Sequence, residues 1–253
     1  MAIASHMVSW MPPRLFVPLI AWQYRFFEPE LGRLDEFVPK HRGAVDVGVW
    51  WGPWSWWLAR RVPRVDAFEP NAELVASLAG VLPSNVQLHP VALGERSGEA
   101  NLWIPPGGMG TEGRASIESS WQPEDVGRMQ PVTTRRLDDF DLGDVGFVKI
   151  DVEGHEFAVL QGAVELLSTQ RPALLVEVEE RSHNEGHLDM IVEFLGDHSY
   201  HGKFLQRRRW HPMEEFDRPG ARSISVRAAQ HGYATNFLLY ARRHVHNFLF
   251  TPR

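Results

Sequence analysis

The chain has 253 residues with a formal net charge of -6, and 43% of its residues are hydrophobic. This length suits one α/β domain with additions, and the negative charge excludes a globally basic surface for nucleic acid. The one basic run, three arginines at 207–209, is too short to change that. The absence of cysteine excludes disulfides and thiolate chemistry, and it is compatible with a reducing cytoplasm, where we expect the protein to be located.

The N-terminal segment differs in composition from the rest of the chain. Residues 1–7 have the composition of a tag remnant, and residues 8–30 form an arm rich in aromatic residues and proline. Three prolines and two arginines interrupt the apolar stretch 10–27, which excludes an uninterrupted membrane span. We expect this arm to pack on the domain or on a second subunit of a homo-oligomer, with a lid over the substrate or a membrane-surface contact as alternatives. Residues 31–253 are expected to form a single domain.

The first element that indicates a ligand is a strand that runs into a glycine turn. After a predicted helix at 30–37, the apolar pattern of residues 44–47 suits a strand buried between two layers. Gly48 and Gly52 then let the backbone turn sharply where a ligand must approach. A helix is predicted at 54–61, so this segment has the order strand, turn, helix that cofactor sites use.

A second short strand at residues 65–68 ends in Glu69, seventeen residues past Gly52. In a doubly wound sheet, the carboxyl end of the second strand lies beside the first glycine turn. Glu69 is therefore expected to accept both hydroxyls of a ribose, which belongs to NAD or to another adenosine cofactor.

The glycine spacing distinguishes these cofactors. A dinucleotide fingerprint needs G-x-G-x-x-G, but the second and third of those places, counted from Gly48, hold Trp50 and Pro53. NAD is therefore disfavoured. The pattern of Asp46, Gly48 and Gly52 resembles motif I of the class I methyltransferases, whose cofactor is S-adenosylmethionine. A turn glycine followed by a core-packed helix is the purely structural alternative.

Tryptophan is unusually dense in and after this turn, at positions 50, 51, 54, 56 and 57. Large aromatic side chains at helical spacing usually pack in a core. We therefore expect core or interface packing, with Trp50 or Trp51 at the edge of the cofactor or acceptor as the alternative.

The middle of the chain contributes a helix at 73–80 and a third strand at 86–93. Small and apolar residues at the end of that strand, Ala92 among them, suit the flat base of an adenine. A strand at 98–104 precedes a glycine-rich loop at 105–113, which is expected to be either a plain surface loop or a lid over the active site.

The second informative stretch is residues 147–156. A buried strand there delivers Asp151, Glu153 and His155 to its carboxyl end, which is where an open α/β sheet places its ligand. A helix follows, and a fifth strand at 172–180 again ends in carboxylates.

The remaining elements complete a sheet. A polar loop at 181–187 precedes a helix at 188–195. Strands at 202–206 and 235–241 are expected to form the antiparallel hairpin that distinguishes a methyltransferase sheet from a dinucleotide-binding one.

These segments together resemble the FkbM family of S-adenosylmethionine-dependent methyltransferases, in order and spacing from about Ala44 to Glu179. The motifs that carry the resemblance are Asp46-Val47-Gly48, Phe68-Glu69-Pro70-Asn71, Asn85-Val86, Val91-Ala92-Leu93-Gly94, Leu137-Asp138-Asp139, Val148-Lys149-Ile150-Asp151-Val152-Glu153-Gly154-His155-Glu156 and Val159-Leu160-Gln161-Gly162-Ala163. One departure is Val49-Trp50-Trp51, where the family usually has small residues.

The resemblance implies a class I methyltransferase fold of the α/β class. Such a fold is Rossmann-like and doubly wound, with a mostly parallel seven-stranded sheet and a C-terminal antiparallel hairpin. The family resemblance also implies O-methylation of a hydroxyl on a sugar, a polyketide or a related product of secondary metabolism. The expected partner is therefore a small-molecule acceptor with hydroxyl groups.

Each expected site residue has a role in this reaction. The expected cofactor-binding residues are Asp46, Gly48, Gly52, Glu69, Pro70, Asn71, Ala92 and Asp151. Asp151 is expected beside the sulfonium and the acceptor, and His155 is the candidate base, with Glu153 or Glu177 as alternatives, because a hydroxyl needs a base to become a good nucleophile. His155 could instead cap or simply open its helix, and Glu153 could fix the strand-to-helix turn.

Four further hypotheses remain open. Asp151, Glu177 and His183 could converge on a divalent ion such as Mg²⁺, although their spacing does not demand it, whereas His244 and His246 are expected to be solvated in a terminal tail. An N-methyltransferase is the nearest alternative within the enzyme class. A non-catalytic adenosine-binding or interaction module, and more distantly a nicotinamide oxidoreductase, are the rivals from other classes.

Overall fold

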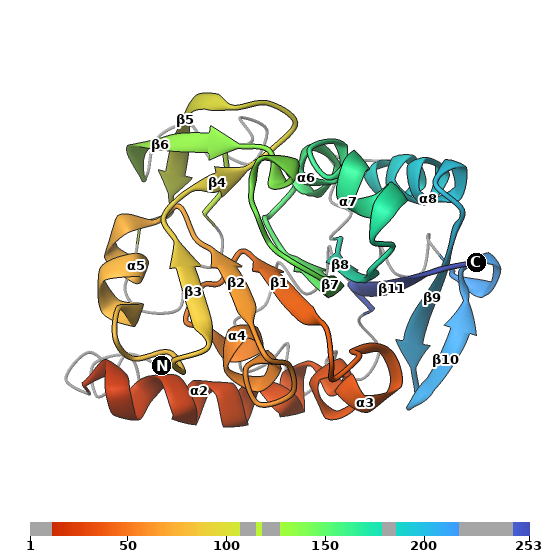
Figure 1. Cartoon of the computed structure of the whole chain (residues 1–253), viewed down its shortest axis with the longest axis horizontal. Helices are drawn as coiled ribbons and strands as arrows, with labels where there is room; N and C mark the ends of the chain where they lie inside the picture. The colour runs from red at the N-terminus through yellow and green to blue at the C-terminus, as the bar shows by residue number, and fades with distance from the viewer. Residues whose placement is uncertain (1–11, 107–114, 118–126, 179–185, 218–244) are drawn as a thin grey trace.

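The computed structural model describes residues 12–106, 115–117, 127–178, 186–217 and 245–253. A large sheet runs through the molecule between two layers of helices, and a small second sheet lies beside it (Figure 1). The expected glycine-rich loop from 107 onward, the polar loop at 181–185 and the strand at 235–241 lie outside the described residues, as does the tag remnant.

The large sheet has eight strands in the order β10-β9-β11-β8-β7-β1-β2-β3. Their bounds are β1 Gly43–Val47, β2 Val65–Phe68, β3 Val86–His89, β7 Val145–Ile150, β8 Ala173–Glu177, β9 Tyr200–Gln206, β10 Arg209–Pro212 and β11 Asn247–Pro252. The five strands β8, β7, β1, β2 and β3 run parallel to one another. The strand β11 runs antiparallel to both β8 and β9.

This arrangement corrects the expected seven-stranded sheet, because the observed sheet is mixed and has an eighth strand. The expected strand at 202–206 corresponds to β9, but β9 forms a hairpin with β10 through Arg207 and Arg208, both with positive φ. A two-residue turn of that kind normally contains Asn or Gly, so no residue pattern indicates it. The strand between β8 and β9 is β11, a segment for which the sequence predicts no element. His246, expected to be solvated, directly precedes this strand and lies 3.9 Å from Glu177.

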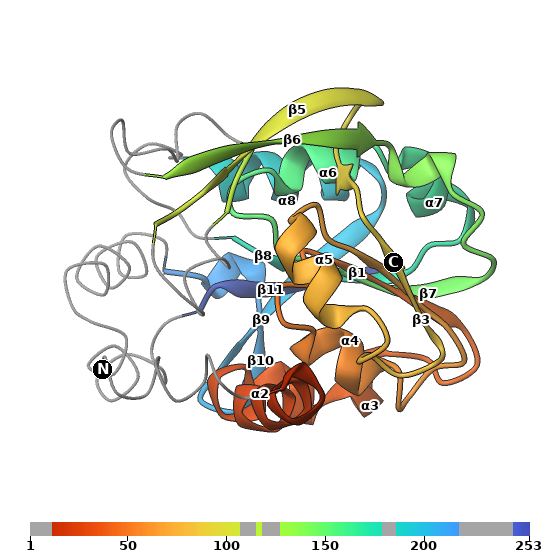
Figure 2. The ribbon, with the colours of Figure 1, turned by 90° about the vertical axis from the view of Figure 1, so that its left-hand side faces the viewer.

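Helices cover both faces of the sheet (Figures 1 and 2). One layer consists of α2 (Pro13–Phe27), η1 (Pro29–Gly32), α3 (Leu34–Phe37) and α4 (Pro53–Leu58), with α5 (Ala72–Leu78) packed against α2. The other layer consists of α6 (Glu156–Gln161), α7 (Val164–Thr169) and α8 (His187–Asp197). The helix expected at 30–37 is in fact two short pieces, η1 and α3.

The alternation of β1 explains how the two layers are held. Val45 and Val47 pack into the cluster formed with α6, α7 and α8. Ala44 faces the opposite side, where it packs with Trp54 and Leu58 of α4. Successive strand residues point to opposite faces, so β1 is buried on both sides, as the sequence predicts.

The small sheet has the order β4-β6-β5, and it contains β4 (Ala92–Leu93), β5 (Gly98–Ile104) and β6 (Arg128–Arg135). The strand expected at 86–93 is therefore split between two sheets. Pro90 separates β3 from β4, and a proline cannot donate to a strand ladder, so pairing with β2 ends at His89. A short 3-10 helix, η4 (Leu137–Asp139), follows β6, and a second, η5 (Met213–Glu215), follows β10.

The N-terminal arm is a helix despite Pro18 in its interior. It packs on α4, where the indole nitrogen of Trp57 donates to the carbonyl of Ala21 at 2.7 Å. The Phe16 ring meets Trp51 edge-on at 5.0 Å between centroids. Among the described residues, no helix has the length and hydropathy that crossing a membrane requires.

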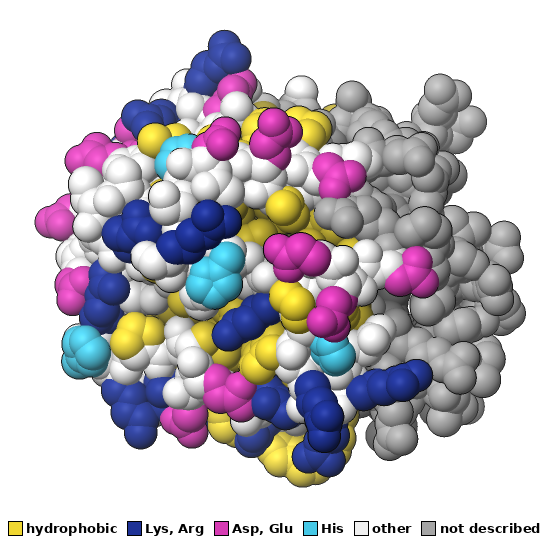
Figure 3. Space-filling model, turned by 90° about the vertical axis from the view of Figure 1, so that its right-hand side faces the viewer, with side chains coloured by type: hydrophobic (Ala, Val, Ile, Leu, Met, Phe, Trp, Pro, Cys, Tyr) yellow, Lys and Arg dark blue, Asp and Glu magenta, His cyan; other side chains and the backbone are white. Residues whose placement is uncertain are grey.

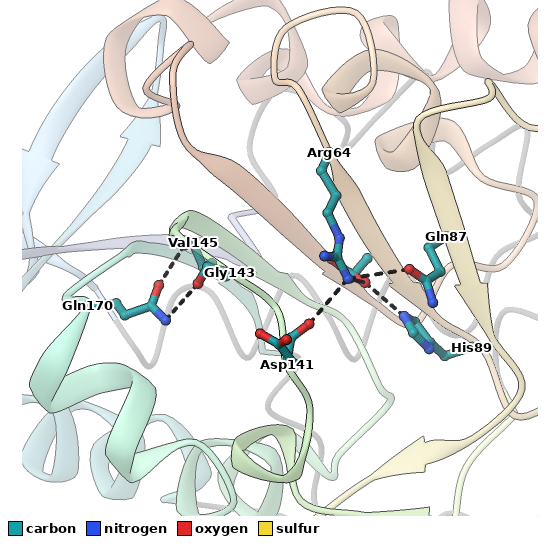
Figure 4. A network of polar contacts seen from close by, with 8 residues as sticks. Arg64, Gln87, His89, Asp141, Gly143, Val145 and Gln170 are labelled. Carbon is teal, nitrogen blue, oxygen red and sulfur yellow. Dashed lines mark hydrogen bonds and ion pairs between the residues drawn. The ribbon is translucent and has the colours of Figure 1, made fainter.

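A polar network fixes the edge of the sheet on the α6–α7 side (Figure 4). Arg64 donates to Asp66, to Gln87 and to the backbone carbonyl of Asp141. His89 contacts the same carboxylate of Asp66 at 2.9 Å. These contacts join β2, β3 and the segment after η4, and none of them involves the residues at the carboxyl ends of β1 and β7.

Candidate functional site

The glycine turn after β1 is shaped by the chain itself. Gly48, Trp50 and Gly52 all have positive φ values, of 84°, 50° and 78°. A Cβ at Gly48 would overlap with the carbonyl oxygen of Asp151, which follows β7. Glycine is therefore needed at position 48 because two backbone segments pack closely there, and not for the approach of a ligand that the sequence analysis expects.

Glu69 lies beside this turn, as the strand order predicts. One carboxylate oxygen accepts a hydrogen bond from the backbone N–H of Trp50 and the other accepts one from Asn71, both at 2.9 Å. Burial raises the pKa of Glu69 to about 7, although both backbone hydrogen bonds lower it. The carboxylate thus joins the end of β2 to the turn after β1.

Asn71 and Asp46 complete the polar surroundings of the turn. Asn71 is fully buried and caps α5 by accepting from the backbone N–H of Glu73. Asp46 is also fully buried, and it accepts from the Ser55 hydroxyl at 2.6 Å. Burial raises the pKa of Asp46 to about 7, against the lowering effects of Ser55 and Lys149.

Several buried polar atoms around the turn have no hydrogen-bond partner among the described residues. They are Asp46 Oδ1, Trp50 Nε1, Trp51 Nε1 and Asn71 Nδ2. Buried polar groups in native proteins are nearly always hydrogen-bonded. This set contains both donors and an acceptor, which fits a polar ligand such as an adenosine-containing cofactor.

A second polar group lies at the carboxyl ends of β7 and β8. The ammonium of Lys149 is fully buried, 3.8 Å from Asp151 and 3.6 Å from Glu177. Lys149 is also the register partner of Asp46 across β1 and β7. Burial lowers the pKa of Lys149, but the surrounding carboxylates outweigh burial and raise it. We call Asp46, Lys149, Asp151 and Glu177 the polar row.

The N-terminal arm contributes to the same place through Glu28. Its carboxylate accepts from the indole N–H of Trp54 at 2.7 Å and from the Asn247 amide at 3.3 Å. Burial raises the pKa of Glu28 to about 8, against the lowering effect of Lys149. Sequence reasoning missed Glu28, because its partners lie 26 and 219 residues further along the chain.

Asp151 and Glu177 differ from the other acids of the site in the solvent exposure of their side chains. Their side chains are 28% and 20% exposed, whereas Asp46 and Glu28 are closed off from solvent. Loss of hydration, and then the neighbouring charge of Glu177, raise the pKa of Asp151 well above its ordinary value. Asp151 is thus a partly accessible carboxylate with a raised proton affinity.

The loop after β7 is held in a defined turn. Glu153 and Gly154 both have positive φ values. The N–H of Gly154 donates to Glu156, whose other oxygen contacts His187 on α8 at 2.9 Å. The Ser116 hydroxyl donates to the backbone carbonyl of Glu153.

Two of the expected site residues lie at the small sheet, one on β4 and the other against the residue that follows β4. Ala92 lies in the small sheet, where it packs with Leu102, Ile104 and Val132. The imidazole of His155 lies against Gly94, with Nε2 3.0 Å from the position that a Cβ there would occupy. Asp46, Gly48, Glu69 and Asp151 are the predicted residues that the structure brings together, with Pro70 and Asn71 at the end of β2.

The structure gives no support to a Mg²⁺ site. Within the described ranges, no group of three His, Cys, Asp or Glu side chains is arranged to hold a metal ion. His183, the third expected ligand beside Asp151 and Glu177, lies outside those ranges.

The strand order and the site define a methyltransferase-like α/β fold with a mixed sheet. Residues 28–204, more than half of the chain, match the family described as "Methyltransferase FkbM domain". The protein therefore belongs to the FkbM methyltransferase family, as the sequence resemblance indicates. No curated protein matches the sequence significantly.

Solved structures with a similar chain trace include three methyltransferase-related proteins. Methyltransferase FkbM from Methylobacillus flagellatus KT has 19% identity and a TM-score of 0.47, covering 66% of this chain and 40% of that one. SMU.1697c from Streptococcus mutans, solved in complex with SAH, has 10% identity and a TM-score of 0.47, covering 90% and 97%. Precorrin-6y C5,15-methyltransferase from Geobacter metallireducens GS-15 has 17% identity and a TM-score of 0.41, covering 74% and 80%.

Proposed function

We propose that this methyltransferase uses S-adenosylmethionine to methylate a hydroxyl group on a sugar, a polyketide or a related secondary metabolite. The observation that carries the cofactor assignment is the Glu69 carboxylate, which two backbone N–H groups hold beside the glycine turn. A carboxylate can accept about four hydrogen bonds, so each oxygen keeps capacity for a ribose hydroxyl.

The residues around Glu69 fit the rest of the cofactor. Asn71 Nδ2 and Trp50 Nε1 are buried donors without a partner among the described residues, and Asp46 Oδ1 is an acceptor in the same condition. We assign Asp46, Gly48 and Gly52 to the methionine part. Pro70 and Asn71 are assigned to the adenosine side, and Ala92 is assigned to the adenine through the small sheet.

S-adenosylmethionine supplies an electrophilic methyl group, so the protein must align an acceptor oxygen and take up its proton. Asp151 is suited to accept that proton, because it is partly exposed at the carboxyl end of β7 and its pKa is raised. His155 and Glu153 follow in the same loop and are the further candidates. Lys149 sits beneath Asp151 and holds its carboxylate in place.

The test is calorimetric titration with S-adenosylmethionine, S-adenosylhomocysteine and NADH. We expect the first two to bind and NADH not to bind. Glu69→Ala should weaken S-adenosylmethionine binding at least about tenfold, because buried polar groups of the ligand would lose their acceptor. Glu73→Ala is the matched control, since that glutamate lies four residues further on, in the first turn of α5, and is exposed.

Glu69 also supports the fold, so unfolding temperatures must be compared, with Glu69→Gln as a milder second variant. Unchanged affinity in a folded Glu69→Ala protein would contradict the ribose assignment. Screening of hydroxylated sugars and polyketides then tests the acceptor, and turnover that survives Asp151→Asn and His155→Ala would indicate an amine acceptor instead.

A further inference from the structure

The outer face of α2 carries a continuous apolar stripe. Leu15, Leu19, Trp22 and Phe26 are 64%, 49%, 58% and 62% exposed. Their spacing of four, three and four residues places them on one side of the helix, and the rings of Trp22 and Phe26 touch at 5.2 Å. Four of the seven large hydrophobic side chains that are exposed among the described residues belong to this stripe.

The stripe is not a by-product of core packing, because α2 uses its other face for that purpose. Phe16, Val17 and Ala21 are buried against the domain. In both ribbon views α2 runs along the outside of the molecule (Figures 1 and 2). The helix is thus apolar on the side that faces outward as well as on the side that faces inward, which is unusual for a surface helix.

The charges near the stripe are basic. The helix contains Arg14 and Arg25 and no acidic residue. Residues 1–64 contain eight Lys and Arg against five Asp and Glu, whereas residues 65–253 contain 18 against 27. The protein as a whole is acidic, so its positive charge is concentrated in the part that includes α2.

Arg14, Arg25, Lys40 and Arg60 form no ion pair within the described residues, whereas Arg42 and Arg64 are paired with Asp144 and Asp66. None of the five acids of residues 1–64 is paired with those four cations. Glu28, Glu30 and Asp46 are buried. The other two, Asp35 and Glu36, are each paired with an arginine. By contrast, the face on the side of α8 and the β9–β10 hairpin mixes basic and acidic side chains (Figure 3).

We propose that the α2 stripe, Leu15, Leu19, Trp22 and Phe26, docks the protein on the surface of an anionic phospholipid bilayer. Exposed apolar and aromatic side chains that enter the headgroup region, flanked by arginines, are the features of interfacial helices. Arg25 on α2 lies over the ring of Trp57, and Arg60 lies over the ring of Trp56 at the end of α4, which packs on α2. These two arginines supply positive charge near the helix.

A second copy of this chain fits the stripe less well. The four side chains expose roughly 450 Å², if each would expose about 200 Å² when free, whereas a stable interface buries about 800 Å² per partner. Two α2 helices would also bring arginines together without any acid on either helix. A bilayer needs only one such helix and is attracted by the arginines.

Docking would place the candidate site near the lipid, because α2 contacts the glycine turn. Tyr24 on α2 contacts Trp50 in the glycine turn, with ring centroids 5.5 Å apart. Glu28, directly after the helix, reaches Trp54 and the polar row. The proposal concerns attachment only and does not depend on the cofactor or the acceptor.

The test is flotation of the purified full chain with vesicles of phosphatidylcholine, alone or mixed with phosphatidylglycerol. We expect flotation with the mixed vesicles, less with phosphatidylcholine alone, and a decrease with added salt. Trp22→Ser combined with Phe26→Ser should weaken partitioning at least about tenfold, because two aromatic side chains no longer enter the bilayer.

Met190→Ser is the matched control, because this side chain on α8 is similarly exposed, at 48%, and lies away from α2. Arg25→Gln with Arg60→Gln should remove the preference for anionic vesicles. Failure of the wild-type protein to float would overturn the proposal. Equal flotation of the double variant would do so too, as would a dimer in sedimentation experiments that only the stripe substitutions dissociate.

Discussion

The carboxyl ends of β1 and β2 and those of β7 and β8 lie at the same edge of the sheet, but they hold their polar groups differently. At β1 and β2, Glu69 accepts from two backbone N–H groups of neighbouring turns. At β7 and β8, one buried ammonium, Lys149, stands between Asp151 and Glu177. The first arrangement is fixed by local backbone geometry and the second by charges from distant parts of the chain.

The two arrangements respond differently to a change in protonation. Hydrogen bonds to the backbone fix a carboxylate independently of the protonation of its neighbours. A buried cluster of one cation and several acids instead couples their proton affinities. We therefore expect substitutions at the glycine turn to act on folding, and substitutions in the polar row to act on stability in a pH-dependent way.

The largest effect is expected at Gly48. Gly48→Ala would place a Cβ onto the carbonyl oxygen of Asp151 at a φ of 84°, so we expect a loss of more than about 4 kcal/mol in the free energy of unfolding. Gly80→Ala is the matched control, because its φ is also positive, at 69°, yet nothing lies within 4 Å of the added atom. It should cost only about 1 kcal/mol. Equal costs in chemical denaturation would show that strain, and not packing on Asp151, sets the requirement for glycine.

A smaller but still large effect is expected when the polar row loses its cation. Lys149→Met leaves the partly exposed carboxylates of Asp151 and Glu177 without their counter-charge, which should cost about 3 kcal/mol. Adding Glu177→Gln should restore part of the loss, roughly 1–2 kcal/mol in a double-mutant cycle. Additive costs in that cycle would mean that Lys149 and Glu177 do not interact.

The smallest effect is expected from Glu28, and it depends on pH. The pKa of Glu28 is raised to about 8, so the folded protein binds a proton that the unfolded chain releases near its ordinary value of 4.5. Stability from this group is complete below the unfolded pKa and is lost as pH rises through about 8. Glu28→Gln should therefore flatten the decline in stability between roughly pH 5 and pH 9.

The variant keeps an amide oxygen that can accept from Trp54 and Asn247, so packing is preserved. The exposed Glu99→Gln serves as the control and should follow the wild-type pH profile. If thermal unfolding of Glu28→Gln and wild type declined in parallel from acid to alkaline pH, Glu28 would not be the titrating group.

Residues that strand order alone brings together can be predicted from the sequence, whereas residues that meet from distant segments cannot. The glycine turn and Glu69 were predictable, because strand order alone brings the end of β2 beside the end of β1. Asp151 was predictable for the same reason. Glu28 and Asn247 were not, since no local pattern tells which distant segment will reach a buried lysine.

The two errors in the sheet have local causes. Pro90 ended the third strand early and sent Ala92 into a second sheet, although the residues from Val86 to Leu93 have a continuous strand composition. Arg207 and Arg208 form a tight turn with residues that rarely adopt positive φ. Pro90 is a sequence signal that the strand can end there, whereas no residue pattern indicates the turn at Arg207 and Arg208.

The position of β11 has a consequence for how the protein reaches its native state. Leu249 of β11 pairs with Leu175 of β8 and with Lys203 of β9, so the strand enters the sheet between two elements that precede it in the chain. Long loops must close before this pairing contributes, which makes late assembly of the sheet slow. Until β11 arrives, β8 and β9 present open edges that other chains can pair with. The yield of refolding is therefore expected to depend on protein concentration more than on the strength of the finished core.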